Sequence, residues 1–179
     1  MSEDKTVKQM LVVKVDKCVG CKSCELACAV EHSMSRELFQ AIQETPPPRT
    51  RVHVGQGSGF AIPMQCRQCA DAPCVSVCPT NALHRASEDG PVILDQDLCI
   101  GCTWCVVACP FGVITLDGGA KTVLKCDQCY ERVARGELPA CVTACPTGAL
   151  EFTSGDRVAA EKREAFMVQI ERSLSKGSV

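Results

Sequence analysis

The chain has 179 residues and a formal net charge of −2, and 16 of its residues are cysteines. A cysteine content of about nine per cent lies in the range where thiol chemistry dominates a fold. No basic block indicates a nucleic-acid partner, and no apolar run reaches the roughly 18 residues of a membrane-spanning helix. The N-terminal sequence MSEDKTVKQM lacks the apolar segment of a secretory signal, so we expect a cytoplasmic protein with reduced, metal-binding thiols.

The first of four cysteine groups lies in KCVGCKSCELAC. It consists of Cys18, Cys21, Cys24 and Cys28. This C-x2-C-x2-C-x3-C spacing is typical of bacterial ferredoxins, in which three thiolates hold one iron–sulfur cluster and the fourth reaches a neighbouring cluster. Gly20, and Gly101 in the third group, are expected to let the backbone pass close to a cluster.

Residues 29–62 form an insertion relative to the second half of the chain. VEHSMSRELFQAIQE predicts a short helix, which the prolines of residues 45–48 stop. Residues 49–63 alternate like a β-hairpin with a glycine-rich tip. Two interpretations stay open: a flap that covers a lobe of the protein, or a docking surface for a catalytic partner.

The second and third cysteine groups are joined by a predicted hairpin. The second group is Cys66, Cys69, Cys74 and Cys78, and the third is Cys99, Cys102, Cys105 and Cys109. Between them we expect a strand, a turn at residues 87–90 and a second strand at residues 92–94, which together bring the two groups side by side. Trp104 is expected to pack against a cluster and limit the access of water.

The fourth group follows another predicted hairpin, GVITLDGGAKTVLKC, and consists of Cys126, Cys129, Cys141 and Cys145. The tail predicts a helix from about Asp156 to Leu174, because Phe166, Ile170 and Leu174 recur at helical spacing. This apolar line is expected to pack either on the chain's own lobe or on a partner.

The chain contains an internal duplication. DKCVGCKSCELAC matches DLCIGCTWCVVAC, and CVSVCPTNAL matches CVTACPTGAL. Pairing CPTGALEF with MLVVKVDKC would rebuild the hairpin that joins groups two and three, so we expect a nested arrangement. The predicted fold is α+β and ferredoxin-like, with two pseudo-symmetric dicluster lobes of short hairpins and short helices, plus a C-terminal helix. The expected boundaries are 1–28 with 110–153 for lobe A, 63–109 for lobe B, 29–62 for the insertion and 154–179 for the helix.

Zinc is the main alternative to iron–sulfur clusters, since two separated C-x2-C pairs can hold a zinc ion. Three cysteines within seven residues, found twice, fit a cubane cluster better. His32, His53 and His84 form no spaced pair and are expected to be ordinary surface or hydrogen-bonded histidines. No catalytic constellation stands out, so we expect a non-catalytic chain.

Four basic residues, Lys17, Lys22, Arg67 and Lys125, are sequence neighbours of the cysteines. They either remain solvated or raise the reduction potentials of nearby clusters.

The four motifs, their order and the widened gap between Cys129 and Cys141 resemble the four-cluster electron-transfer subunits of molybdenum and tungsten oxidoreductases, the DMSO-reductase-type beta subunits. Similar small subunits serve formate hydrogenlyases, carbon monoxide dehydrogenases and tungsten aldehyde oxidoreductases. The resemblance implies four [4Fe–4S] clusters. The ligand sets that it implies are Cys18, Cys21, Cys24 with Cys145; Cys126, Cys129, Cys141 with Cys28; Cys66, Cys69, Cys74 with Cys109; and Cys99, Cys102, Cys105 with Cys78.

The sequence therefore predicts an electron-transfer subunit that relays single electrons between a catalytic oxidoreductase subunit and a second redox subunit or carrier. The expected catalytic partner is a molybdenum or tungsten pterin enzyme, such as an aldehyde oxidoreductase or formate dehydrogenase. The alternatives are a free polyferredoxin and a subunit of a hydrogenase or carbon monoxide dehydrogenase complex. Self-assembly into longer chains is a further option.

Overall fold

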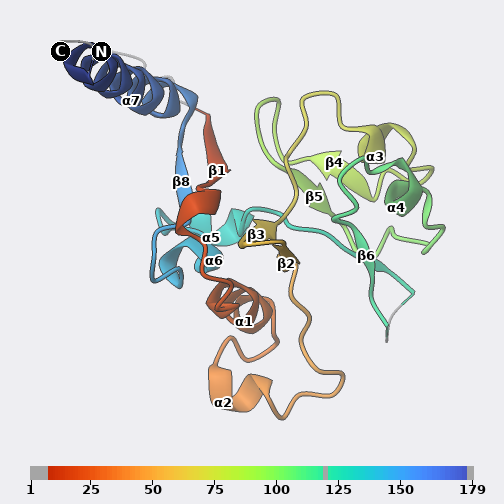
Figure 1. Cartoon of the computed structure of the whole chain (residues 1–179). Coiled ribbons are helices and arrows are strands. Elements are labelled where there is room, and N and C mark those ends of the chain that lie inside the picture. Colours follow the sequence, from red (N-terminus) through yellow and green to blue (C-terminus); the bar gives the residue numbers. More distant parts are fainter. Residues whose placement is uncertain (1–7, 119–120, 177–179) are drawn as a thin grey trace, which may run out of the picture. The chain divides into compact units, whose positions relative to one another are not determined.

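The computed structural model of the chain describes residues 8–118 and 121–176, and its elements are short except for the last helix (Figure 1). The residues form two compact units. One is drawn from both ends of the chain, up to Val12 and from Phe152 on, and the other spans Val13–Glu151. The larger unit carries all sixteen cysteines.

In the larger unit, the first and fourth cysteine groups meet through their helices. After a 3-10 turn, η1 (Val15–Lys17), helix α1 (Ser23–Glu31) starts inside the first group. Helices α5 (Tyr130–Ala134) and α6 (Ala140–Thr143) belong to the fourth group, and α1 packs against α6. The cysteine groups at the two ends of the sequence are therefore neighbours in space.

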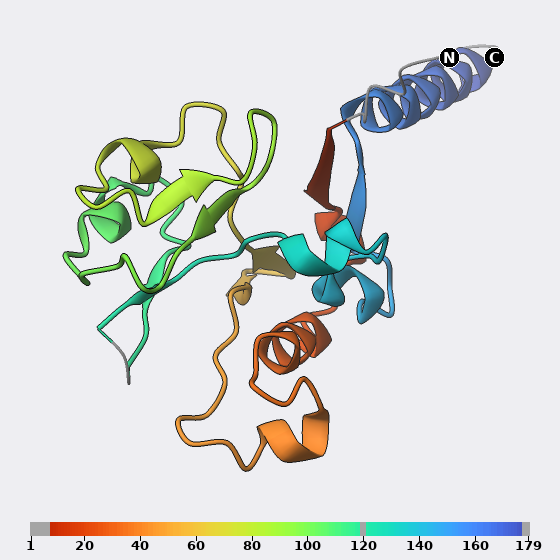
Figure 2. The same ribbon diagram turned by 180° about the vertical axis from the view of Figure 1, so that it is seen from behind.

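The second and third groups meet in the same way. Strands β4 (Leu83–Arg85) and β5 (Val92–Leu94) form the predicted antiparallel hairpin, and α3 (Pro73–Ser76) packs against α4 (Trp104–Ala108). These elements are the yellow and green ribbons seen from behind in Figure 2. Their core consists of Ala72, Cys74, Leu83, Val92, Cys105, Ile114 and Val123. Cysteine thus supplies part of the apolar interior, because the chain has few aromatic side chains to fill it.

The insertion matches its predicted hairpin but not its predicted helix. Strands β2 (His53–Gly57) and β3 (Phe60–Met64) pair around a glycine-rich tip. Helix α1 ends at Glu31, however, and only one further turn forms, α2 (Leu38–Ala41). The side chain of Glu44 accepts hydrogen bonds from the backbone of Met34 and Ser35, and that of Glu37 caps α2. These side chains satisfy backbone N–H groups that a continuous helix would have used, so the helix is interrupted.

The hairpin that precedes the fourth group is also present, as β6 (Thr115–Leu116) and β7 (Val123–Leu124). The last two residues of its predicted DGGA turn lie outside the described residues.

Strands β1 (Gln9–Val13) and β8 (Leu150–Ser154), each partly in the smaller unit, pair as the duplication predicts. Helix α7 (Gly155–Lys176) follows β8 directly and confirms the predicted C-terminal helix. Its apolar side chains Phe166, Ile170 and Leu174 are exposed, so the described part of the chain does not cover them. No described helix has both the length and the apolar character needed to cross a bilayer.

Candidate functional site

Three hollows of similar size are each lined by four cysteines. Their volumes, counted out to the open surface, are about 300, 330 and 320 Å³. The cysteines around them are, in the same order, Cys18, Cys21, Cys24 and Cys145; Cys66, Cys69, Cys74 and Cys109; and Cys78, Cys99, Cys102 and Cys105. Each hollow takes three cysteines from one sequence group and the fourth from another group.

The remaining four cysteines form a set of their own, which is wholly buried. Its members are Cys28, Cys126, Cys129 and Cys141, each at most 9% exposed. Burial raises the pKa of Cys126 and Cys129 to about 12. Burial also raises the pKa of Cys141, and the charges of its three neighbours in the set raise it further. Each of the other three sets has a single buried cysteine.

The donor sets fit polynuclear iron–sulfur clusters. None of the three hollows has an acidic or histidine residue among its lining residues, so each offers thiols alone. Three of the four thiols in each hollow come from one short loop, a spacing that fits a cubane cluster better than the two separated C-x2-C pairs typical of a zinc site. The buried set likewise offers four thiols.

The ligand loops depend on left-handed backbone. Gly20 and Gly101 both have φ of +69°, and Lys22 and Thr103 follow with φ of 62° and 65°, so the repeated motifs share one loop conformation. A Cβ on Gly101 would also clash with the carbonyl oxygen of Lys121. The structure therefore explains these glycines by backbone conformation and by packing against the chain's own residues.

Backbone N–H groups point at several cysteine sulfurs. Arg51 N donates to Cys28 Sγ at 3.2 Å, and Ala149 N donates to Cys145 Sγ at the same distance. Such bonds stabilise the anionic thiolate form and tune the potential of a bound centre.

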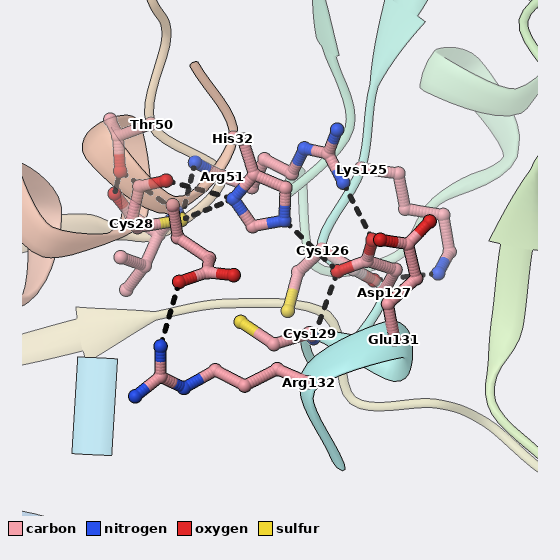
Figure 3. A network of polar contacts seen from close by, with 12 residues as sticks. Cys28, His32, Thr50, Arg51, Lys125, Cys126, Asp127, Cys129, Glu131 and Arg132 are labelled. Atoms are coloured by element: carbon pink, nitrogen blue, oxygen red, sulfur yellow. Dashed lines mark hydrogen bonds and ion pairs between the residues drawn. The ribbon is translucent and has the colours of Figure 1, made fainter. Parts of the chain in front are cut away.

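A polar network surrounds Cys28 in the buried set (Figure 3). His32 Nδ1 lies 3.7 Å from Cys28 Sγ and 2.8 Å from its carbonyl oxygen, and Nε2 lies 3.3 Å from Asp127. Asp127 also accepts hydrogen bonds from Arg51 at 2.8 Å and from the backbone of Cys129 at 2.9 Å. Sequence reasoning missed Arg51 and Asp127, because a pairing across 76 residues leaves no local pattern.

The hydrogen bonds and charges of this network shift the pKa values of the side chains around Cys28 Sγ. Burial lowers the pKa of His32, but its hydrogen bonds to Asp127 and Cys28 outweigh this effect and raise the pKa to about 9. Burial raises the pKa of Asp127, but the hydrogen bond from His32 and the charge of Arg51 hold it well below its usual range. Burial would raise the pKa of Cys28 as well, yet the hydrogen bond to His32 and its charge bring it below the ordinary value.

His32, Asp127 and Cys129 place their ligand atoms within 4.8 Å of one another. Cys129 also belongs to the four-thiol set, and the other two side chains are engaged with each other. We therefore treat this trio as part of the surroundings of the buried set, in keeping with the prediction of a hydrogen-bonded His32.

The basic neighbours of the cysteines differ in their environments. Lys17, Lys22 and Arg67 are exposed, whereas Lys125 is only 2% exposed. Trp104 is 65% exposed to solvent within the described chain, and its packing against a cluster stays a prediction.

Comparison with known proteins finds iron–sulfur proteins, both among family profiles and among individual relatives. Two family profiles, each described as a 4Fe-4S dicluster domain, match residues 17–83 and 58–155. An "Iron-sulfur protein" of Rhodospirillum rubrum is 44% identical over 170 residues, which cover 88% of this chain and 88% of the relative. "Electron transport protein HydN" of Escherichia coli (strain K12) is 38% identical, covering 88% of this chain and 96% of the relative. One polypeptide of the anaerobic dimethyl sulfoxide reductase of the same strain is 37% identical, covering 82% of this chain and 74% of the relative.

Proposed function

Because the chain belongs to the 4Fe–4S dicluster family of ferredoxin-like electron-transfer proteins, we propose that it carries four [4Fe–4S] clusters and serves as the electron-transfer subunit of an oxidoreductase complex. The observation that carries this proposal is the gathering of sixteen cysteines into four sets of four. When bound, such clusters accept and release single electrons at potentials set by their surroundings. The chain itself makes and breaks no substrate bonds in this proposal.

The proposed ligands are the four sets described above. In each set, three cysteines come from one sequence group and the fourth from the group that packs against it. The meeting of α1 with α6 and of α3 with α4 supports this exchange. The proposed lobe A comprises residues 1–28 and 110–153 and the proposed lobe B residues 63–109, and the cysteines of both lie in the larger unit.

The protein's task in this proposal is to hold the centres, exclude water and tune them. Burial differs among the sets, and the Cys28 set is enclosed while Cys21 is exposed. Backbone N–H groups and nearby charges act on individual sulfurs. These are the means by which a protein spreads the potentials of chemically identical centres.

For partners, we propose a catalytic oxidoreductase subunit and a second redox subunit or carrier. A relative that is itself part of a dimethyl sulfoxide reductase supports a molybdenum or tungsten pterin enzyme as the catalytic partner. The exposed apolar line on α7 favours a dedicated subunit over a free carrier, because a diffusing carrier has no need of it.

Two cysteine double variants test the ligand exchange, with the chain purified without oxygen. Removing one ligand set should remove about one quarter of the iron and acid-labile sulfide, since four equal clusters are expected. If Cys21 and Cys145 serve one cluster, Cys21→Ala with Cys145→Ala loses no more iron than either single variant. Cys21→Ala with Cys28→Ala should then lose about half of the iron.

The opposite pattern, with the larger loss in the Cys21/Cys145 double variant, would mean that each sequence group holds its own cluster. Protein with bound metal but no sulfide would refute the iron–sulfur proposal in favour of zinc. Mass spectrometry of what co-purifies with the chain from its native cells then tests the subunit role, and recovery of the iron-loaded chain alone would favour a free carrier.

A further inference from the structure

Lys125 is a buried cation at the junction of two cysteine sets. It is only 2% exposed, and its Nζ donates hydrogen bonds to the carbonyl oxygens of Val92 at 2.6 Å and Cys126 at 2.8 Å. Val92 lies on β5, in the core that contains Cys74, whereas Cys126 belongs to the wholly buried set. Figure 3 shows Lys125 directly beside Cys126 and Asp127.

Gln68 crosses the same junction. Its Nε2 donates to the carbonyl oxygen of Cys126 at 3.0 Å, and its Oε1 accepts from Val92 N at 2.8 Å. Its own backbone N–H donates to Cys66 Sγ at 3.4 Å. The Lys125 side chain is therefore fixed between the Cys66 set on one side and the Cys126 set on the other.

The charge of Lys125 lacks an acidic partner. In the described ranges, no acidic side chain forms an ion pair with it. Burying an unpaired cation is strongly unfavourable, so compensating negative charge is needed nearby. The groups available for this compensation are the thiolates of the two flanking sets.

We propose that the charge of Lys125 raises the reduction potentials of two centres, the one held by the Cys66 set and the one held by the Cys126 set. This inference rests on the proposed function. One electron from an external reductant makes either centre more negative by one charge, with no bond made or broken. Lys125 stabilises that added charge through the low-dielectric interior. Because it faces both sets, it acts on both couples.

The residues that directly precede the other cysteine motifs serve as comparisons. Lys17 stands directly before Cys18 as Lys125 stands before Cys126, but Lys17 is exposed and screened by water. Gln65 stands directly before Cys66 and is 1% exposed, but it is neutral. Of the residues that directly precede these three motifs, only Lys125 is both buried and charged.

The test is a redox titration of the full iron-loaded chain, monitored by electron paramagnetic resonance, for wild type, Lys125→Met and Lys17→Met. For Lys125→Met we expect the equilibrium constant for reduction to fall about tenfold at two of the four centres. This fall lowers the reduction potential of each by about 59 mV for a one-electron couple. Lys17→Met should change no couple by more than about twofold, because exposed charges are screened. Iron and sulfide content is measured on every sample.

Lys125→Gln separates charge from hydrogen bonding, since glutamine keeps donors but carries no charge. A shift like that of Lys125→Met supports the proposal, whereas wild-type potentials in Lys125→Gln would assign the effect to hydrogen bonds and overturn it. Unchanged couples in iron-loaded Lys125→Met would overturn it too, and loss of clusters from both neutral variants would overturn it in favour of a structural role. A wild-type chain that binds no clusters would instead refute the proposed function.

Discussion

Asp127 provides a direct test of how much the network around the buried cysteine set stabilises the protein. We consider Asp127→Asn, which keeps the size of the side chain but removes its charge. The side chains of Asp127, Arg51 and His32 are 24%, 17% and 12% exposed. Breaking a fully buried ion pair costs about 3–5 kcal/mol, and partial solvent access reduces this to about 2 kcal/mol here.

The neighbouring pair of Arg36 and Glu131 is a matched control. It has a similar length of 2.9 Å, but its side chains are 51% and 72% exposed. An exposed pair contributes about 0–1 kcal/mol, so Glu131→Gln should be close to neutral. The two substitutions are chemically alike and differ mainly in burial.

The assay follows the loss of the visible absorbance of the iron-loaded protein in denaturant without oxygen, because a protein that loses its clusters unfolds irreversibly and stability is then a rate. About 2 kcal/mol corresponds to a rate increase of roughly thirtyfold for Asp127→Asn. Glu131→Gln should stay within about threefold of wild type. Adding Arg51→Met to Asp127→Asn should cost little more, since the pair is already broken. Equal rates for Asp127→Asn and Glu131→Gln would refute the reasoning from burial.

Three further predictions concern other parts of the chain. Gly101→Ala should destabilise the iron-loaded protein by more than the roughly 1–2 kcal/mol expected of Gly148→Ala, because both have positive φ but only Gly101 faces the Lys121 carbonyl, and the same absorbance assay compares them. Deletion of residues 156–179 should leave iron content unchanged while co-purification of partners is lost; lost iron would contradict a partner-binding role for α7. Removal of the metal with a chelator should unfold most of the chain, since its cysteines form part of its core, and a native-like cooperative melt in circular dichroism would contradict this.

The cysteine spacing and the internal duplication predicted the hairpins at β4–β5 and β1–β8 and the groups that meet. These features depend on local patterns, which sequence periodicity and turn residues reveal. The insertion was harder: its apolar spacing indicated one helix over residues 30–44, but the side chains of Glu37 and Glu44 take up the backbone donors and leave two short pieces.

Electrostatic surroundings could not be predicted in the same way. Four basic residues have similar positions beside cysteines in the sequence, and only the fold shows that Lys125 is buried while Lys17 is exposed. Arg51 and Asp127 pair across 76 residues, and nothing near either residue in the sequence indicates that partner.

The nested pairing of the cysteine groups has a consequence for biosynthesis. On a ribosome, the second and third groups are complete once residue 109 has emerged, so both of their centres can be built while the rest of the chain is still being made. In the proposed ligand sets, the site of Cys18 also needs Cys145, so its first three ligands would wait for more than a hundred further residues. During that interval Cys18, Cys21 and Cys24 are unfilled thiols, open to oxidation or to the wrong metal. The proposed ligand sets therefore predict that the chain can mature from its middle outwards, and that a truncated chain ending after residue 109 can fill its central sites but not its terminal ones.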